Sequence, residues 1–495
     1  MKMNDTTRII IAFALIMLVL LGWQVITPKR KPAQVPVATT ATETTKTNVQ
    51  PTPYIPSSQT QVSQILPVTE TENVLENSKI KITFSSLGGT IKSVYLKKYH
   101  AELVPANAHI LQTQIANDSI KTNNWQVAYQ DASTLVYRGQ FKKFYRLNND
   151  YTLTLTLEPN NGILPDYQIN YDAGLAMTEV NKKDEYKNFS LFYQTPLKAN
   201  KVPASKIKTP TVTDVQWVGL KSKYFTAILS NTGKATINMT TLADGRIGYI
   251  YKPLDKNAGD YTLYFGPLDY NILKSYKHNW EALNDLGWTK VFSIAILKIL
   301  LFLYMIFKNY GIVIIVFSII MKVIFYPLTR MSTKQMQQMQ MLQPKIEELK
   351  KKYKSDAQAL NRETMALYRV YKINPFSGCL PLVFQMPIFW ALYAVLQKTI
   401  ELRHANFIFW IKDLSLKDPI YVLPILMGVS FLVQNFLTTA DKKNTALLIF
   451  MPIFLTVIFL NFPSGLQLYW LIFNLLSIGE SIIARGGIKW KTLKI

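Results

Sequence analysis

Lys322 is the residue of this sequence whose type and position most call for a chemical explanation. It lies inside Gly311–Arg330, a run about as long as the ~20 apolar residues that cross a bilayer. A cation near the bilayer centre costs roughly 2.5–3.5 kcal/mol on insertion scales. A chain keeps such a residue where it lines a protein-enclosed or watery space, or where it extends to the membrane surface as a bystander. These two alternatives imply different functions.

Polar side chains recur on single faces of several apolar segments. Ser318, Lys322 and Thr329 stand at positions i, i+4 and i+11, so they share one face of a helix. Interhelical hydrogen bonds, worth ~0.6 kcal/mol each on average, are sufficient to explain amides and hydroxyls in such places. The polar residues of the other segments are Gln467, Asn474, Ser477 and Ser481 on one face of the last segment, and Gln385 and Gln434 on two more.

Lys322 needs a different explanation, because no Asp or Glu lies deep in these segments to pair with it. Glu480, near the end of a segment, is the nearest candidate. An unpaired cation among amides and hydroxyls indicates a hydrated concavity. Such a concavity would attract acidic or polar peptide segments and lower the cost of carrying them through hydrocarbon. A proton relay would need paired carboxylates or a chain of histidines, which these segments lack.

The remaining sequence offers no recognisable catalytic or metal-binding motif. His100, His109 and His278 are far apart, and none has a metal-ligand spacing. GxSxG, HExxH and paired-cysteine motifs are missing from the sequence. Cys379 is the single cysteine, so an intramolecular disulfide is impossible, and we interpret it as a buried small residue. We therefore expect a chain that is not an enzyme, with no catalytic residue, no cofactor and no metal.

The first part of the chain is mostly polar. One apolar run, Ile9–Val25, is longer than the core of a cleavable signal peptide and predicts an uncleaved transmembrane anchor over residues 1–27. Residues 28–74 are rich in Pro, Thr, Gln and Ser, and we expect a flexible tether there.

Residues 75–290 predict an all-β domain. Leu153, Leu155 and Leu157 alternate with threonines, a period of two that is typical of strands. Asp244-Gly245 separates two further apolar runs and predicts a hairpin. A series of short strands of this length favours one large sandwich. We expect a structural or binding role for this domain rather than catalysis.

Residues 291–485 are mostly apolar and predict a membrane domain. The stretch 291–307 contains Lys298 and could either span the membrane or lie at its surface. Residues 331–373 have a helical pattern and predict a helical hairpin, with a break at Lys354-Ser355-Asp356. The predicted spans are 311–329, 380–397, 421–437, 446–461 and 466–483, followed by a short basic tail at 486–495.

Basic residues indicate the orientation. The chain carries a net charge of +24, and the loop from Arg330 to Gly378 holds ten Lys or Arg against four Asp or Glu. Basic loops stay in the cytoplasm, so we place this loop and the C-terminus there. If 291–307 does not span, the β domain is periplasmic and the N-terminus is cytoplasmic. The charge also suits anionic membrane lipids; ribosomal RNA is an alternative partner, and we expect no DNA.

Several motifs of the membrane domain resemble the YidC family of membrane protein insertases, which includes the mitochondrial oxidase-assembly and chloroplast Albino insertases. The N-terminal anchor, tether and β domain, with FSSLGGTIKSVYLKKY, resemble its Gram-negative form. The matching stretches are Tyr326-Pro327-Leu328-Thr329, Met341-Leu342-Gln343-Pro344-Lys345-Ile346, Asn374-Pro375, Gly378-Cys379, Pro381-Leu382, Gln385-Met386-Pro387-Ile388-Phe389, Pro424-Ile425-Leu426-Met427-Gly428, Met451-Pro452 and Phe462-Pro463-Ser464-Gly465-Leu466.

The resemblance implies a fold of six transmembrane helices, the anchor plus a five-helix core, with a periplasmic β-supersandwich. It makes 291–307 an interfacial helix. It implies an insertase and chaperone of the bacterial inner membrane, which integrates and helps fold nascent inner-membrane proteins, alone or with the Sec translocon. The substrate would enter a positively charged hydrophilic groove that is open to the cytoplasm. The short tail makes a strong contact with the ribosome doubtful.

Within that groove we assign roles to individual residues. Lys322 supplies the charge, where the family usually has arginine, so that the planar bidentate fork is lost. The groove would be hydrated by Gln385, Asn474 and Ser477, and an apolar slide for the entering helix would be formed by Phe389, Met427, Tyr469 and Trp470.

Two other functions remain as alternatives. A polytopic transporter or channel would need a path through the membrane and usually inverted repeats, and the sequence indicates neither. In the other alternative, the β domain binds glycans and the membrane part is only an anchor.

Overall fold

The computed structural model describes residues 70–115, 125–206, 211–255, 259–374, 380–438 and 445–486. The expected anchor (1–27), nearly all of the expected tether (28–74), Cys379 and nearly all of the expected tail (486–495) lie outside these residues. Residues 342–373 belong to a unit separate from the rest of the described chain, and each unit is considered by itself.

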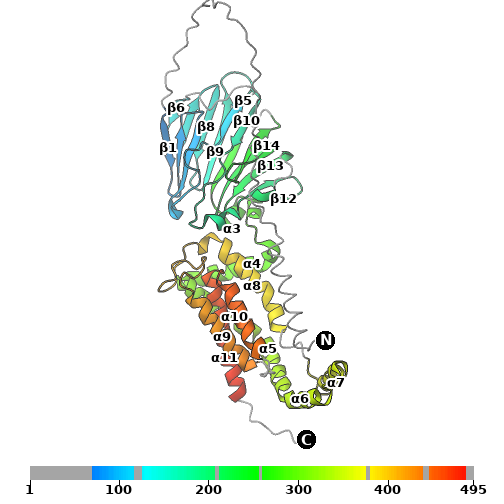
Figure 1. Ribbon diagram of the computed structural model, residues 1–495. Helices are drawn as coiled ribbons and strands as arrows, with labels where there is room; N and C mark the ends of the chain where they lie inside the picture. Colours follow the sequence, from blue (N-terminus) through cyan, green and yellow to red (C-terminus); the bar gives the residue numbers. More distant parts are fainter. Residues whose placement is uncertain are drawn as a thin grey trace, which may run out of the picture. The chain divides into compact units, whose positions relative to one another are not determined.

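The β domain contains two antiparallel sheets among the described residues (Figure 1). The smaller sheet has the order β1 (Glu72–Glu76), β2 (Ile80–Ser85), β3 (Thr90–Leu96) and β4 (Ala101–Glu102). The larger sheet has the order β12 (Ala199–Pro203), β11 (Ser190–Gln194), β13 (Thr211–Lys221), β14 (Phe225–Thr241), β16 (Asp260–Pro267), β9 (Thr152–Pro159), β8 (Phe141–Leu147), β7 (Thr134–Arg138) and β6 (Gln126–Gln130), with β15 (Ile247–Pro253), β10 (Tyr167–Tyr171) and β5 (Gln112–Ile115) branching from β14.

The alternation in the sequence explains why these strands form. Leu153, Leu155 and Leu157 of β9 are buried, and threonines stand between them in the strand. The predicted hairpin at Asp244-Gly245 is confirmed, because β14 pairs with β15 on either side of it. Gly245 has φ of +83°, which favours glycine, and a Cβ there would lie 2.2 Å from Tyr186 Oη. The expected all-β domain is therefore present.

Short helices lead from the β domain to the bundle. They are α3 (Tyr270–Ser275), η4 (Trp280–Leu283) and η5 (Gly287–Thr289); a further short helix, α2 (Lys182–Tyr186), lies between β10 and β11. Asp269 caps α3 by accepting hydrogen bonds from the backbone N–H groups of Asn271 and Ile272. Trp280 is fully buried in the core of the β domain, so this connection is packed against the sheet.

The apolar half of the chain forms a helical bundle. Close packing joins α9 to α11 and to α10, α5 to α11, and α4 to α8 and α5. The helices are α4 (Lys290–Phe307), α5 (Tyr310–Met341), α8 (Leu380–Lys398), α9 (Val422–Thr438), α10 (Thr445–Phe459) and α11 (Ser464–Gly486), with η7 (Ile400–Leu402) after α8.

Among the described residues, three helices are long and apolar enough to cross a membrane: Gly287–Phe307, Tyr310–Met341 and Ser464–Ile483. Val422–Leu437 and Ile449–Phe459 are shorter apolar helices. The expected class, apolar helices joined to an all-β domain, is thus confirmed. The number of six spans and the surface position of 291–307 stay predictions, since length and composition allow 291–307 to cross as well.

The helix after the first core span is longer than expected. The sequence suggested a span at 311–329 followed by a separate hairpin, whereas α5 continues without interruption through Pro327 to Met341. A proline inside a helix removes one hydrogen bond but does not have to end the helix. In the separate unit, α6 (Gln343–Lys352) and α7 (Ala357–Val370) pack together, and Asp356 caps α7 through the N–H groups of Gln358 and Ala359.

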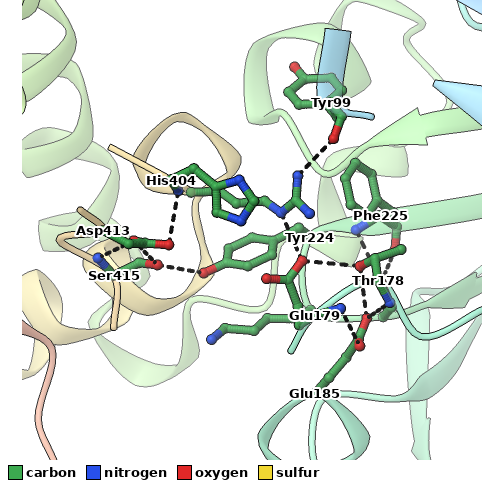
Figure 2. A network of polar contacts seen from close by, with 12 residues as sticks. Tyr99, Thr178, Glu179, Glu185, Tyr224, Phe225, His404, Asp413 and Ser415 are labelled. Atoms are coloured by element: carbon green, nitrogen blue, oxygen red, sulfur yellow. Dashed lines mark hydrogen bonds and ion pairs between the residues drawn. The ribbon is translucent and has the colours of Figure 1, made fainter. Parts of the chain in front are cut away.

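Arg403 joins the loop after α8 to the β domain through Glu179 and Tyr99, which are labelled in Figure 2. Its Nε donates to Glu179 Oε1 at 2.7 Å, and a guanidinium N–H donates to the carbonyl of Tyr99 at 3.1 Å. The guanidinium carbon lies 5.2 Å from the ring centre of Phe225. Ile400 joins the apolar core of the β domain. The loop is therefore anchored by a buried ion pair and by apolar packing.

A second set of hydrogen bonds lies beside this ion pair (Figure 2). Tyr224 Oη donates to Ser415 Oγ at 3.3 Å, and Ser415 Oγ donates to Asp413 at 2.6 Å. Asp413 also accepts from the backbone N–H of His404 at 3.1 Å. The loop between α8 and α9 is thus folded on itself and is hydrogen-bonded to Tyr224, the residue before β14.

Candidate functional site

Lys322 lies buried between two helices of the bundle. Its Nζ lies 2.7 Å from Glu480 Oε2 and 2.8 Å from Ser477 Oγ, both on α11. The ammonium is also 5.1 Å from the ring centre of Phe473, close enough for a cation–π contact. The side chain of Lys322 is 9% exposed and that of Glu480 is 14% exposed. This ion pair joins α5 to α11 inside an apolar bundle.

The expectation that Lys322 has no acidic partner is wrong. Glu480 is close to the end of α11 by sequence, but α5 and α11 pack side by side. A lysine and a glutamate also have long flexible stems, so their charges can meet when their backbones are offset along the helices. The Lys322 charge is therefore neutralised in this structure, and a free cation does not describe the site.

Thr329 belongs to the same group of side chains. Its hydroxyl lies 3.3 and 3.2 Å from the two carboxylate oxygens of Glu480. A buried ion pair needs such additional hydrogen bonds to offset the loss of water around both charges. Lys322, Thr329, Ser477 and Glu480 form what we term the charged cluster.

The other polar residues predicted for the site are buried in pairs. The side-chain amide of Gln385 on α8 donates to the hydroxyl of Tyr469 on α11. Asn474 donates to Ser430 Oγ of α9 at 3.2 Å. Both contacts lie between helices and fit the hydrogen-bond explanation given by the sequence. Asn474 and Ser477 lie one turn apart on α11, which links the Ser430 contact to the charged cluster.

Three of the four residues expected to form an apolar slide are buried in the bundle core. They are Phe389 at 8% exposure, Met427 at 1% and Tyr469 at 0%, whereas Trp470 is half-buried. The ring of Phe389 lies 5.7 Å from that of Trp470 and 5.9 Å from that of Phe459. These side chains hold α8, α10 and α11 together in this conformation. A sliding surface made of them would require the helices to separate.

Sequence reasoning named Glu480 only as the nearest acidic candidate for Lys322, without expecting the pair, and it missed Ser430. Glu480 stands three residues after Ser477, so the helical period alone would have placed it on the polar face of α11. Ser430 stands four residues before Gln434, and its neighbours carry no further polar signal. A complete count of each helix face would have grouped Glu480 with Ser477. The contact of Ser430 with Asn474 depends on how α9 is rotated.

Comparison with known proteins identifies the chain. A family described as "60Kd inner membrane protein" matches residues 302–491, and one described as "YidC periplasmic domain" matches residues 134–299. The YidC membrane protein insertase of Geobacter sulfurreducens is 37% identical over 442 residues, which cover 80% of this chain and 83% of the relative. That of Geotalea uraniireducens is 33% identical and covers 96% and 98%. The chain belongs to the YidC family of membrane protein insertases.

A crystal structure of an active YidC insertase is 20% identical, covers 83% of this chain and 92% of that chain, and has a TM-score of 0.42. Family membership makes the chain a membrane protein whose β-sandwich is the periplasmic domain, and its clients are nascent membrane proteins. The recognition made from the motifs of the membrane domain is therefore confirmed.

Proposed function

We propose that the chain inserts and helps fold proteins of the bacterial inner membrane, without enzymatic chemistry, and that the charged cluster receives the polar part of the substrate. The observation that supports this most directly is the buried pair of Lys322 and Glu480 between α5 and α11. A buried ion pair inside an apolar bundle is a costly feature, and replacing it by apolar residues is often neutral or stabilising. The presence of such a pair is explained if its charges bind the polar parts of substrates.

A charged substrate segment would replace one member of the Lys322–Glu480 ion pair. An acidic or polar substrate segment would take the place of Glu480 against Lys322, with Ser477 within hydrogen-bond reach of the ammonium. A basic segment would use Glu480 instead. In either case the substrate finds charge and hydrogen bonds inside the membrane, so the free-energy cost of leaving water is lower. Gln385 and Asn474 would supply further hydrogen bonds once α8, α9 and α11 separate.

Phe389, Met427, Tyr469 and Trp470 would then face the apolar part of the substrate. Their aromatic and thioether side chains are large and adaptable, which suits apolar helices of different sequence. In this proposal the helical hairpin α6–α7 meets the substrate at the cytoplasmic face, and both chain termini are cytoplasmic. The Sec translocon is the partner for larger substrates. The ribosome is a further, weakly bound partner in this proposal.

The decisive experiment measures contact and charge together. A photo-crosslinking amino acid at 322, 389, 427 or 470 is expected to label a stalled nascent membrane protein, while the same group at the exposed residue Ile483 is not. Lys322→Ala and Lys322→Glu are expected to reduce insertion of a substrate with an acidic translocated tail, with Lys322→Glu the more severe. If both insert this substrate as well as the wild type, the role of the charge is rejected. Solute flux in proteoliposomes without substrate would favour a channel instead.

A further inference from the structure

Three lysines from separate elements meet beside the junction of the β domain and the bundle. In the sheet, Gly219 of β13 pairs with Phe192 of β11, which pairs with Lys201 of β12. Paired residues of antiparallel strands point to the same face, and so do residues two apart on one strand. Lys221, two residues after Gly219, therefore shares a face with Lys201, and its ammonium lies 5.8 Å from the ring centre of Phe192.

Asp285, between η4 and η5, ties two of these lysines together. Lys201 forms an ion pair with its carboxylate, and Lys398 at the end of α8 donates to its backbone carbonyl at 2.7 Å. The charges of Lys201, Lys398 and Asp285 all act on the buried ammonium of Lys221. We term Lys201, Lys221 and Lys398 the lysine cluster. Its three cations surround a single carboxylate, so it keeps an excess of positive charge.

Lys221 is the central residue of this cluster. It is 5% exposed, and within the described part of the chain no carboxylate, carbonyl or hydroxyl accepts a hydrogen bond from its ammonium. A buried ammonium normally has such partners, because the loss of water is otherwise uncompensated. The neighbouring Asn284 is 7% exposed, and its side-chain N–H₂ group also lacks an acceptor. The ammonium of Lys221 and the fully buried amide donor of Asn284 thus both lack an acceptor among the described residues, and Asn284 directly precedes Asp285 in the chain.

The surroundings place the cluster at the level of lipid headgroups. Lys398 ends an apolar helix, and α4 begins five residues after Asp285. At that start Trp288, Val291 and Phe292 are 75%, 79% and 50% exposed. Exposed aromatic residues at the end of an apolar helix are typical of the membrane–water interface. Acyl chains could cover these side chains while a headgroup reaches the lysines.

We propose that the lysine cluster binds the phosphate of an anionic phospholipid in the outer leaflet of the membrane. The phosphate oxygens would accept hydrogen bonds from Lys221 and from Lys398 or Lys201, and the excess positive charge would balance the phosphate. The bound lipid would fix the junction between the β domain and α4 and α8 against the membrane surface. This site is separate from the charged cluster of Lys322 and does not depend on the function proposed for it.

The same geometry makes binding depend on pH. Burial lowers the pKa of Lys221 to about 7, and the cations Lys398 and Lys201 act in the same direction. The carboxylate of Asp285 opposes this shift. A bound anion favours the charged lysine, so binding raises that pKa and takes up a proton. Affinity for an anionic lipid is therefore expected to rise as the pH falls through 7.

The test measures lipid binding to the full-length protein in detergent by native mass spectrometry, with phosphatidylglycerol and phosphatidylcholine at about pH 6 and about pH 8. The wild type is expected to prefer phosphatidylglycerol, more strongly at the lower pH. Lys221→Met keeps most of the length of the side chain and removes its charge, and it is expected to weaken phosphatidylglycerol binding about fivefold and abolish the pH dependence. Lys252→Met, at an exposed lysine of β15, is the matched control and should change neither.

Three results would overturn the proposal. The first is equal binding of the two lipids by the wild type. The second is that folded Lys221→Met and Lys398→Gln both bind phosphatidylglycerol as the wild type does, with the same pH dependence. Lys398→Gln changes the cluster on a different element, so it still tests the proposal if Lys221→Met does not fold. The third is displacement of the lipid by millimolar inorganic phosphate, since that would assign the cluster to a soluble anion instead of a lipid.

Discussion

Lys322 Nζ and Glu480 Oε2 lie 2.7 Å apart and connect α5 to α11 across 158 residues of sequence. Neither charge has an equivalent alternative partner among the described residues, since Ser477 and Thr329 supply only hydroxyls. The two residues therefore act as one unit, and their effects on stability should not be additive.

Removing one member of this pair should cost more than removing both. Glu480→Gln or Lys322→Met leaves an uncompensated buried charge and is expected to lower the free energy of unfolding by about 3 kcal/mol. The double variant should lose less than about 3 kcal/mol, which is less than half of the summed loss of the two single variants. Thermal unfolding in detergent measures all four proteins. Additive losses would mean that the two charges do not interact in the folded protein.

The anchorage of the loop after α8 depends on Arg403. Arg403→Ala leaves Glu179 buried without its cation, and the expected loss of stability is about 3 kcal/mol. Amide hydrogen exchange should rise at residues 178–186 and 399–415, which the ion pair holds together. Lys417→Ala, at a lysine of the same loop whose contact with Tyr421 is exposed, is the control. Unchanged exchange at both segments in Arg403→Ala would contradict this role.

Glu401 should make stability depend on pH. Burial, together with the nearby carboxylate of Asp269, raises its pKa to about 7, although a backbone hydrogen bond and Lys98 oppose the shift. The folded state then holds this proton more tightly than the unfolded state does. The stabilisation is complete below about pH 4.5 and is lost as the pH rises through 7, up to about 3 kcal/mol in total.

Thermal unfolding between about pH 5 and about pH 8 measures this dependence. Glu401→Gln should flatten the profile and stabilise the protein at the upper end relative to the wild type. Glu158→Gln, at an exposed glutamate of β9, should leave the profile as it is. A wild-type profile as flat as that of Glu401→Gln would exclude the assigned pKa.

Gly428 allows α9 and α10 to approach each other closely. A Cβ at this position would lie 2.0 Å from Thr456 Oγ1 of α10, far inside contact distance. Gly428→Ala is expected to destabilise the protein by about 1–3 kcal/mol, because the helices must move apart. Thr456→Ala should restore part of the loss in the double variant. Gly479→Ala, whose Cβ would meet nothing within 4 Å, is the matched control.

A large part of the fold could be predicted from local patterns. The period of two in β9 and the Asp-Gly turn between β14 and β15 identify strands and a hairpin, because side-chain direction in a strand is set by the backbone. The bundle helices are identified by the length of the apolar segments, because a helix needs ~20 apolar residues to cross a bilayer. The polar face of α11, with Asn474 and Ser477, follows from the helical period.

What a sequence pattern could not determine was which faces meet. The helical period gives the residues that share a face, but the rotation and offset of each helix depend on how all the helices pack together. Lys322 was therefore expected to have no acidic partner, whereas tertiary packing places Glu480 beside it as an ion pair. Packing also decided that Phe389 and Tyr469 are buried in the core of the bundle.

The lysine cluster shows most clearly what the sequence could not predict. Lys201, Lys221 and Lys398 are unremarkable in the sequence, because each stands alone in a separate segment. Strand register brings the first two onto one face, and the packing of α8 against η5 adds the third. By itself the sequence determined the two regions of the chain, the class of each and the presence of a charge among apolar residues. The partners of each charge were decided by tertiary structure, because electrostatic energy depends on distance in space and not along the chain.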